Sequence, residues 1–280
     1  MAYTTINKST DYFNTKLYTG TGASSQAQTG VGHAPDFVWI KSRSTSEGHV
    51  LADAVRGATK YLISNTTSAE VTNTDTVKSF DSDGYTIGPA GVTGGNGVTF
   101  ASWNWKANGA GSSNTDGSIT STVSANTTSG FSIVKYTGTG SSGTIGHGLG
   151  VPPTAIITKR VSATEQWFTW IQGITSAGGF LKLDVTNAAS TNNTAFPWNP
   201  QANTFGVSGD AATNSSGLTY IAYCFAEKPG YSKMNSYIGN GNSDGAFIYT
   251  GFKPAFLIVK NTAISDNWSM FNNKALGYNT

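Results

Sequence analysis

Aromatic side chains beside amide and hydroxyl groups are the residues of this sequence best suited to a chemical task. Flat aromatic faces with polar partners commonly bind sugars, and the chain is rich in both types. Residues 196–200 place Trp198 and Asn199 between two prolines in an expected loop, and Trp170 lies in an aromatic cluster. We interpret Trp198, Asn199 and Trp170 as candidate ligand-binding residues. The competing interpretation for each tryptophan is burial in a core, where a large aromatic contributes several kcal/mol.

No comparable set of residues in the sequence is suited to catalysis. The chain has four glutamates, and no Asp/Glu pair lies in a context that suggests the acid and nucleophile of a glycosidase. His33, His49 and His147 are interpreted as loop residues rather than metal ligands or catalytic groups. We therefore predict no enzyme activity, no catalytic residues, no metal and no cofactor.

Two loop types resemble ligand sites but lack the full pattern. Residues 81–84 (DSDG) open like a calcium loop, yet no glutamate follows at the required spacing, so an aspartate–glycine hairpin turn is expected. The glycine-rich segments 20–32 and 138–150 contain no Lys-Ser/Thr pair and precede expected strands. They are therefore interpreted as tight loops rather than phosphate-binding loops.

Composition excludes several partners. Charged residues make up 11% of the 280 residues, the formal net charge is +2, and lysines and arginines are scattered along the chain, so nucleic acid is not an expected partner. No apolar run is long enough to span a membrane, and the first residues lack the apolar segment of a signal peptide. Cys224 is the only cysteine, so no intrachain disulfide forms. These features predict synthesis in a cytoplasm.

An internal repeat organises the chain. The motif at Tyr18 (YTGTG) recurs at Tyr136, and a third copy (YIGNG) begins at Tyr237. Glycine, proline and lysine follow each leading tyrosine at identical distances of 14, 17 and 23 residues. Later in the repeat, residues 97–105 resemble residues 217–225. A unit of about 100–120 residues has the size of a domain.

These spacings divide the chain into copies. We predict a first repeat over 1–109, a Gly/Ser/Asn linker over 110–118, a second repeat over 119–230 and the start of a third over 231–280. The third copy lacks a counterpart of residues 97–105, which would leave a sheet edge and an apolar face exposed. Either another chain completes it or the sequence is part of a longer protein, and we favour the second interpretation.

Strand patterns dominate every copy. Residues 37–41, 155–159 and 256–260 are β-branched and aromatic runs that follow a proline, as expected of central strands buried on both faces. Residues 131–136 alternate and predict a half-exposed strand, whereas the best helical candidate is the short segment 51–56. We predict an all-β protein of tandem antiparallel β-sandwich domains, jelly-roll or lectin-like, two complete and one partial.

The repeat also assigns most tryptophans to the core. Trp167 and Trp268 occupy equivalent repeat positions, where copy one has His49. Trp103 and Trp105 share one face of an expected strand. We expect all four tryptophans to be buried.

Residues 217–233, continuing into 237–241 and 251–256, resemble a repeated domain of virion proteins in tailed bacteriophages, especially marine and cyanobacterial ones. Such proteins are usually described as tail-fibre or structural proteins. The resemblance covers copies two and three well and copy one less closely. It implies location in the virion, other virion proteins as partners and a homo-oligomer, with a trimer favoured by the symmetry of fibres. It implies no particular catalytic or binding residues.

Three functions are therefore open. The first is a non-enzymatic tail fibre or appendage that displays β-sandwich domains for attachment to host-surface glycans. The second is a capsid decoration or head-fibre protein with an assembly or stabilising role. The third, which we favour least, is a glycan depolymerase.

Overall fold

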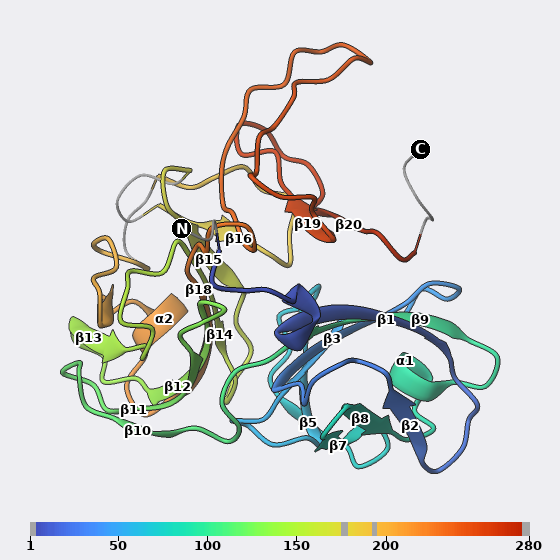
Figure 1. Ribbon diagram of the computed structural model, residues 1–280. Helices are drawn as coiled ribbons and strands as arrows, with labels where there is room; N and C mark the ends of the chain where they lie inside the picture. The colour runs from blue at the N-terminus through green and yellow to red at the C-terminus, as the bar shows by residue number, and fades with distance from the viewer. Residues whose placement is uncertain (1–3, 175–178, 192–194, 276–280) are drawn as a thin grey trace.

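The computed structural model describes residues 4–174, 179–191 and 195–275. Regular structure in these ranges is mostly β-strand, arranged in antiparallel sheets (Figure 1). The helical elements are single turns: η1 (Ser9–Asp11), α1 (Gly91–Gly94) and α2 (Ala211–Asn214). The predicted all-β class is confirmed.

Copy one, residues 1–109, contains a large sheet and a small sheet. The large sheet has the strand order β1-β9-β3-β4-β5-β6, and the small sheet has the order β2-β8-β7. The strands are β1 (Phe13–Thr19), β2 (Gln26–Thr29), β3 (Phe37–Ser42), β4 (Val50–Asp53), β5 (Lys60–Ile63), β6 (Val71–Thr72), β7 (Val77–Asp81), β8 (Gly84–Ile87) and β9 (Thr99–Trp105).

Copy two, residues 119–230, repeats this plan. Its large sheet, which β10 from the preceding segment 110–118 joins, has the order β10-β11-β12-β18-β14-β15-β16, and β13 pairs with β17 in a small sheet. The strands are β10 (Ser112–Asn114), β11 (Ser121–Asn126), β12 (Phe131–Thr137), β13 (Gly143–Gly146), β14 (Ala155–Arg160), β15 (Phe168–Ile171), β16 (Leu181–Lys182), β17 (Thr204–Val207) and β18 (Thr219–Phe225).

The two copies share register as well as order. In each, the last long strand (β9 or β18) lies between the strand of the leading tyrosine and the strand that follows the proline. Tyr18 lies opposite Phe100, and Tyr136 lies opposite Tyr220. The rings stack with centroids 5.1 and 5.3 Å apart, respectively. The repeat seen in the sequence is therefore a repeat of structure.

Copies one and two each have an apolar core between their large and small sheets. In copy one the core joins residues such as Val38 and Phe100 of the large sheet to Tyr85 and Ile87 of β8. In copy two an equivalent core contains Phe205 of β17. Burial of these large side chains stabilises each copy through removal of apolar surface from water.

A third apolar cluster lies between the copies. It gathers side chains from the opposite faces of both large sheets and from copy three, including Trp105, Tyr223 and Phe256. The rings of Phe37 and Tyr223 stack 4.3 Å apart, and those of Trp105 and Phe256 are 5.5 Å apart. We call it the central cluster. Because it covers the second face of each large sheet, strands such as β3 and β9 are buried on both sides.

Copies one and two meet along a row of hydrogen bonds that we call a seam, and an equivalent seam joins copies two and three. Trp167 donates its indole N–H to the carbonyl of Ile63, and Trp268 donates to the carbonyl of Lys182. Three further hydrogen bonds of the first seam each have a counterpart in the second. In the first seam, Lys159 Nζ and Glu165 N donate to Thr67 O, and Glu70 N donates to Val161 O. In the second seam, Lys260 Nζ and Asp266 N donate to Thr186 O, and Ala189 N donates to Thr262 O. One repeated seam and one shared cluster indicate an approximate threefold arrangement of the copies, which Figure 1 shows as three lobes.

Copy three, residues 231–280, has two named strands in its described part, β19 (Phe256–Val259) and β20 (Ser269–Asn272), which pair with each other. They correspond to β3 and β4 of copy one. Residues 232–249, which include the counterpart of β1, form no strand. Large apolar side chains are exposed here, including Ile238, Phe247 and Tyr249.

Three details correct the sequence predictions. Part of the segment interpreted as a linker, residues 110–118, is strand β10, which pairs with β11 of copy two. Strand β12 is buried rather than half-exposed, because the core of copy two covers one of its faces and the central cluster covers the other. The helical candidate 51–56 instead contains the end of β4 and a turn.

Candidate functional site

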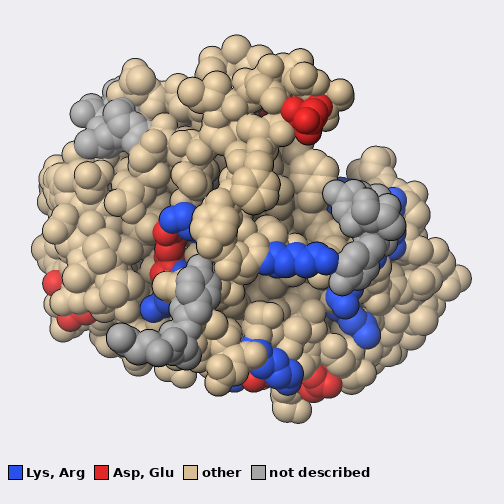
Figure 2. All heavy atoms as spheres, turned by 45° about the horizontal axis from the view of Figure 1, so that its top comes forward, with Lys and Arg blue, Asp and Glu red and all other residues tan. Residues whose placement is uncertain are grey.

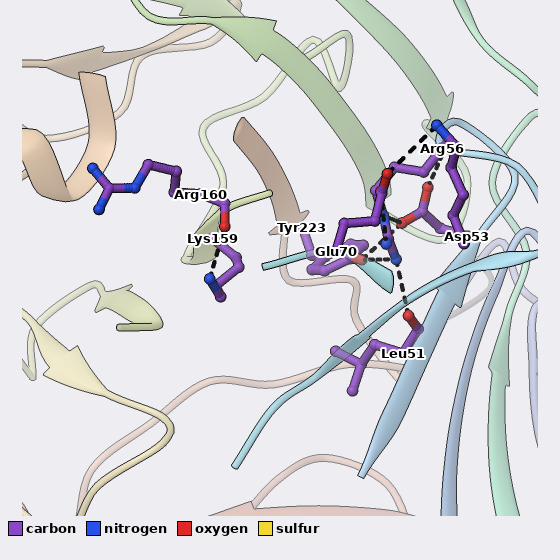
Figure 3. Close-up of polar contacts among 8 residues, drawn as sticks. Leu51, Asp53, Arg56, Glu70, Lys159, Arg160 and Tyr223 are labelled. Atoms are coloured by element: carbon purple, nitrogen blue, oxygen red, sulfur yellow. Dashed lines mark hydrogen bonds and ion pairs between the residues drawn. The ribbon is translucent and has the colours of Figure 1, made fainter. Parts of the chain in front are cut away.

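The most concentrated polar chemistry lies at the seam between copies one and two, around Arg56 (Figure 3). Arg56 follows β4, and its guanidinium is fully buried, although arginine is almost never buried unless paired. Its Nε lies 2.5 Å from Asp53 Oδ2, and its Nη1 lies 3.2 Å from Glu70 Oε2. Two carboxylates therefore compensate the buried cation.

Copy two completes the environment of Arg56. The Tyr223 hydroxyl, on β18, donates to Asp53 Oδ2 at 2.8 Å and accepts from Arg56 Nη2 at 3.3 Å. Nη2 also donates to the carbonyl of Leu51. Burial alone would lower the pKa of Arg56, but Asp53, Tyr223 and Glu70 together raise it above its ordinary value. The guanidinium is thus permanently charged and donates from each of its nitrogens to protein groups.

A small cavity of about 160 Å³ opens beside this network. Its lining residues are Arg56, Lys60, Glu70, Lys135, Val161, Ser162 and Thr219. Lys60 lies 3.4 Å from Glu70, so the acidic group is shared by two cations. The volume suits a few water molecules, well below the usual 300–1,000 Å³ of a ligand pocket. We assign this network a structural role, holding two copies together.

Lys159 is a second buried cation at the same seam. Its ammonium donates to the carbonyls of Thr67 in copy one and Arg160 in copy two. Burial lowers the pKa of Lys159 to about 8, against a weaker opposing effect of Glu165. Lys159 and its counterpart Lys260 therefore each bind one backbone carbonyl of the preceding copy, whereas Lys41 binds carbonyls within copy one.

The structure separates the three candidate ligand-binding residues. Trp198 and Asn199 lie exposed in the loop before β17. Trp170, on β15, is 2% exposed in the core of copy two and has no surface to offer a glycan. Trp170 is therefore corrected to a core residue.

Trp198 has the geometry of an open aromatic platform. In the repeat, Trp198 takes the place of Lys78 of β7. The segment around Trp198 forms no strand, because the prolines on either side of it cannot donate backbone hydrogen bonds to a neighbouring strand. A Cβ built on Gly206 of β17 would lie 2.1 Å from Cε2 of Trp198, so the indole lies directly over this glycine. The side chain is still 38% exposed.

The remaining motifs have structural partners. Asp81 accepts hydrogen bonds from Ser79 and Thr86, and Asp83 accepts from the amides of Gly30 and Gly32, which lower its pKa. His147 contacts the carbonyl of Gln201. Across the described residues, no group of three His, Cys, Asp or Glu side chains could hold a metal ion.

Trp167, Trp103 and Trp105 are buried as predicted, whereas Trp268 is only partly buried. Sequence reasoning missed the network around Arg56. A signal for it existed, because Asp53 and Arg56 are separated by three positions beside the apolar strand 50–52.

A family model described as a domain of unknown function, DUF7483, matches residues 8–280. The chain belongs to the DUF7483 family. No curated protein and no solved structure matches the DUF7483 chain. In the described part of the chain, no helix has the length and apolar character needed to cross a membrane.

Proposed function

We propose that the DUF7483 chain is a non-enzymatic structural protein of a phage virion, displayed on a tail fibre or similar appendage and attaching to host-surface glycans. The observation that carries the proposal is the repeated seam, which joins copies of one β-rich unit through tryptophan and lysine side chains that donate to backbone carbonyls. Such packing favours a rigid scaffold over a moving catalytic cleft.

We further propose that copies one and two are each β-sandwich units. In each of these copies a large sheet packs against a small sheet around a core of its own, which supports this organisation. The low charge of the surface supports a role in display. Figure 2 shows a face that is mostly uncharged, with lysine, arginine and acidic side chains in isolated groups.

The exposed platform at Trp198 is the proposed glycan contact. One face of its indole covers Gly206, and the exposed part of the ring is available for stacking against a sugar. Asn199 is exposed beside it and supplies amide groups. No other residues are assigned to the site.

Binding to a panel of bacterial surface glycans tests this contact. Trp198→Ala should abolish the binding seen with the unmodified chain, and Gly206→Ala should weaken it because the added methyl displaces the indole. Tyr249→Ala removes an exposed tyrosine of copy three and is the matched control. Equal binding by Trp198→Ala and Tyr249→Ala would contradict the assignment.

The exposed apolar side chains of copy three favour a second candidate, a capsid decoration or head-fibre protein. This role requires an apolar interface with other virion proteins and no affinity for cells. Adsorption of host cells to the purified chain distinguishes the two functions.

A further inference from the structure

The cavity beside the Arg56 network is lined by more positive than negative side chains. Its charged lining residues are the three cations Arg56, Lys60 and Lys135 and the carboxylate of Glu70. This set has a net formal charge of +2, which equals the formal charge of the whole chain. The remaining charges of the chain therefore balance, and its positive excess corresponds to one small cavity between two copies.

Lys135 is the cation whose charge is left uncompensated at this cavity. Among the described residues, no group forms a hydrogen bond or an ion pair with its ammonium, although the side chain is half-buried. Lys135 lies on β12 two residues after Ile133, so it points to the same side of the sheet, which packs against the central cluster. At this repeat position copy one has Leu17 and copy three has Ser236. The fold of a copy therefore does not require a lysine here.

Two further donors at the cavity are also incompletely used. The guanidinium of Arg56 has five N–H groups and makes the four hydrogen bonds described above, so one N–H of Nη1 has no acceptor among the described residues (Figure 3). The Arg56 side chain is 1% exposed, so bulk water does not readily satisfy this group. Ser162 Oγ accepts from Thr219 N, which leaves the proton of the Ser162 hydroxyl free to donate.

We propose that this cavity binds inorganic phosphate, as the monohydrogen dianion, at the seam between copies one and two. The two negative charges of the anion balance the net charge of the lining. A tetrahedral oxyanion takes about the space of two water molecules, roughly 60 Å³, so a cavity of about 160 Å³ holds one ion with water beside it. The cavity is too small for a sugar or a nucleotide.

Glu70 selects phosphate over sulfate at this site. Its two carboxylate oxygens contact Arg56 and Lys60, and a carboxylate has further lone pairs that accept hydrogen bonds. Monohydrogen phosphate has an O–H that donates to such an oxygen. Sulfate has the same shape and charge but no proton, so its oxygens would be repelled by the carboxylate.

The bound ion would join the two copies. Arg56, Lys60 and Glu70 belong to copy one, whereas Lys135 and Ser162 belong to copy two. A ligand that requires both copies in their packed arrangement binds the folded chain alone and stabilises it by mass action. The proposal does not rest on the proposed function.

Isothermal titration calorimetry of the full 280-residue chain with sodium phosphate tests the proposal. The titration is made at about pH 8, where phosphate is mostly the dianion, with the ionic strength held constant by sodium chloride. We expect saturable binding of one phosphate per chain. Sulfate should bind about tenfold more weakly or less, because it lacks the hydrogen bond to Glu70.

Lysine variants locate the site. Lys135→Leu introduces the residue that copy one has at this position, and it should weaken phosphate binding about tenfold or more through loss of a charge-assisted contact. Lys60→Met should weaken binding in the same direction. Lys8→Leu is the matched control, since it removes one positive charge from an exposed pair with Asp11 and does not line the cavity.

Glu70→Gln tests the selectivity. The amide has the shape of the carboxylate but no negative charge, so sulfate should bind this variant more tightly than it binds the unmodified chain. The preference for phosphate should therefore shrink. Circular dichroism of each variant confirms that it is folded.

Absence of saturable phosphate binding to the unmodified chain would overturn the proposal. Equal affinities of Lys135→Leu and Lys8→Leu for phosphate would overturn the location of the site. Equal binding of phosphate and sulfate to the unmodified chain would overturn the assignment of phosphate, and an unchanged preference in Glu70→Gln would overturn the role of Glu70.

Discussion

Arg56 shows how one residue joins two copies. Its charge is buried at the seam and is balanced by Asp53 and Glu70 of copy one, while Tyr223 of copy two hydrogen-bonds both Arg56 and Asp53. A buried ion pair adds little net stability compared with apolar packing, but removal of one partner leaves an uncompensated charge. The network therefore specifies how the copies fit together more than it adds stability.

Arg56→Met should lower the free energy of unfolding by about 3–5 kcal/mol, because Asp53 stays buried without its cation. Urea unfolding followed by circular dichroism measures the change. Lys60→Met is the control: the Lys60 side chain is 41% exposed, and loss of its contact with Glu70 should cost no more than about 1 kcal/mol. A similar loss in both variants would contradict the account of the network.

His49 makes stability depend on pH. Its Nδ1 accepts the indole N–H of Trp39, which requires a neutral ring, and burial lowers the pKa of His49 to about 4. The unfolded chain takes up this proton near pH 6.5, so the stabilisation is fully present above that pH and is lost as the pH falls toward 4. The expected loss from His49 is roughly 1–2 kcal/mol between pH 7 and pH 5.

His49→Gln should reduce this pH dependence, because an amide oxygen accepts the same hydrogen bond without titrating. Urea midpoints at pH 7 and pH 5 provide the measurement. Part of the dependence should persist, since burial also lowers the pKa of His33 and His147. An unchanged slope in His49→Gln would show that the ring does not stay neutral in the folded chain.

At the scale of elements, β-branched and aromatic runs after a proline were enough to predict β3 and β14 as central strands, whereas β19, predicted in the same way, is partly exposed and pairs only with β20 among the described residues. The runs beginning at Phe37, Ala155 and Phe256 are β3, β14 and β19, and a turn at residues 82–83 joins β7 to β8. Burial of β12 could not be predicted, because its outer face is covered by residues of other copies. Trp170 was misassigned for a related reason: an aromatic cluster looks the same in sequence whether its faces are covered or open.

The matched tryptophans of the two seams provide a direct comparison. Trp167→Phe should cost about 2–4 kcal/mol, since the side chain is fully buried and donates to the carbonyls of Ile63 and Thr66. Trp268→Phe should cost less than half as much, because Trp268 is partly exposed. Chemical denaturation of both variants gives the comparison, and equal costs would contradict the difference in burial.

At the scale of the molecule, copies one and two share the central cluster, so neither buries its large sheet without the other. The repeat was visible in sequence, yet tandem motifs do not reveal whether units are separate or packed together. The hydrogen bonds that pack the copies together are accepted mostly by backbone carbonyls, and no sequence pattern marks these groups.

Hydrogen exchange should therefore report one cooperative unit. Amides of β9 and β18 are expected to exchange at similar rates through a shared opening, and those of β19 and β20 much faster. Mass spectrometry of exchanged peptides measures all four strands in one experiment. Protection that differs strongly between β9 and β18 would mean that the two copies open independently.

The expected homotrimer remains a prediction, and three copies around one cluster also give a single chain approximate threefold symmetry. Sedimentation velocity of the purified chain distinguishes a trimer from a monomer. A trimer would favour a fibre built from three chains, whereas a monomer would contradict the expected homo-oligomer.

Localisation on particles tests the central claim most directly. Under the proposed function, gold-labelled antibodies against the chain should label the tail of phage particles purified from the source of the sequence. Labelling of the head alone would contradict the attachment function and favour decoration. Absence from the particle would contradict a virion role altogether.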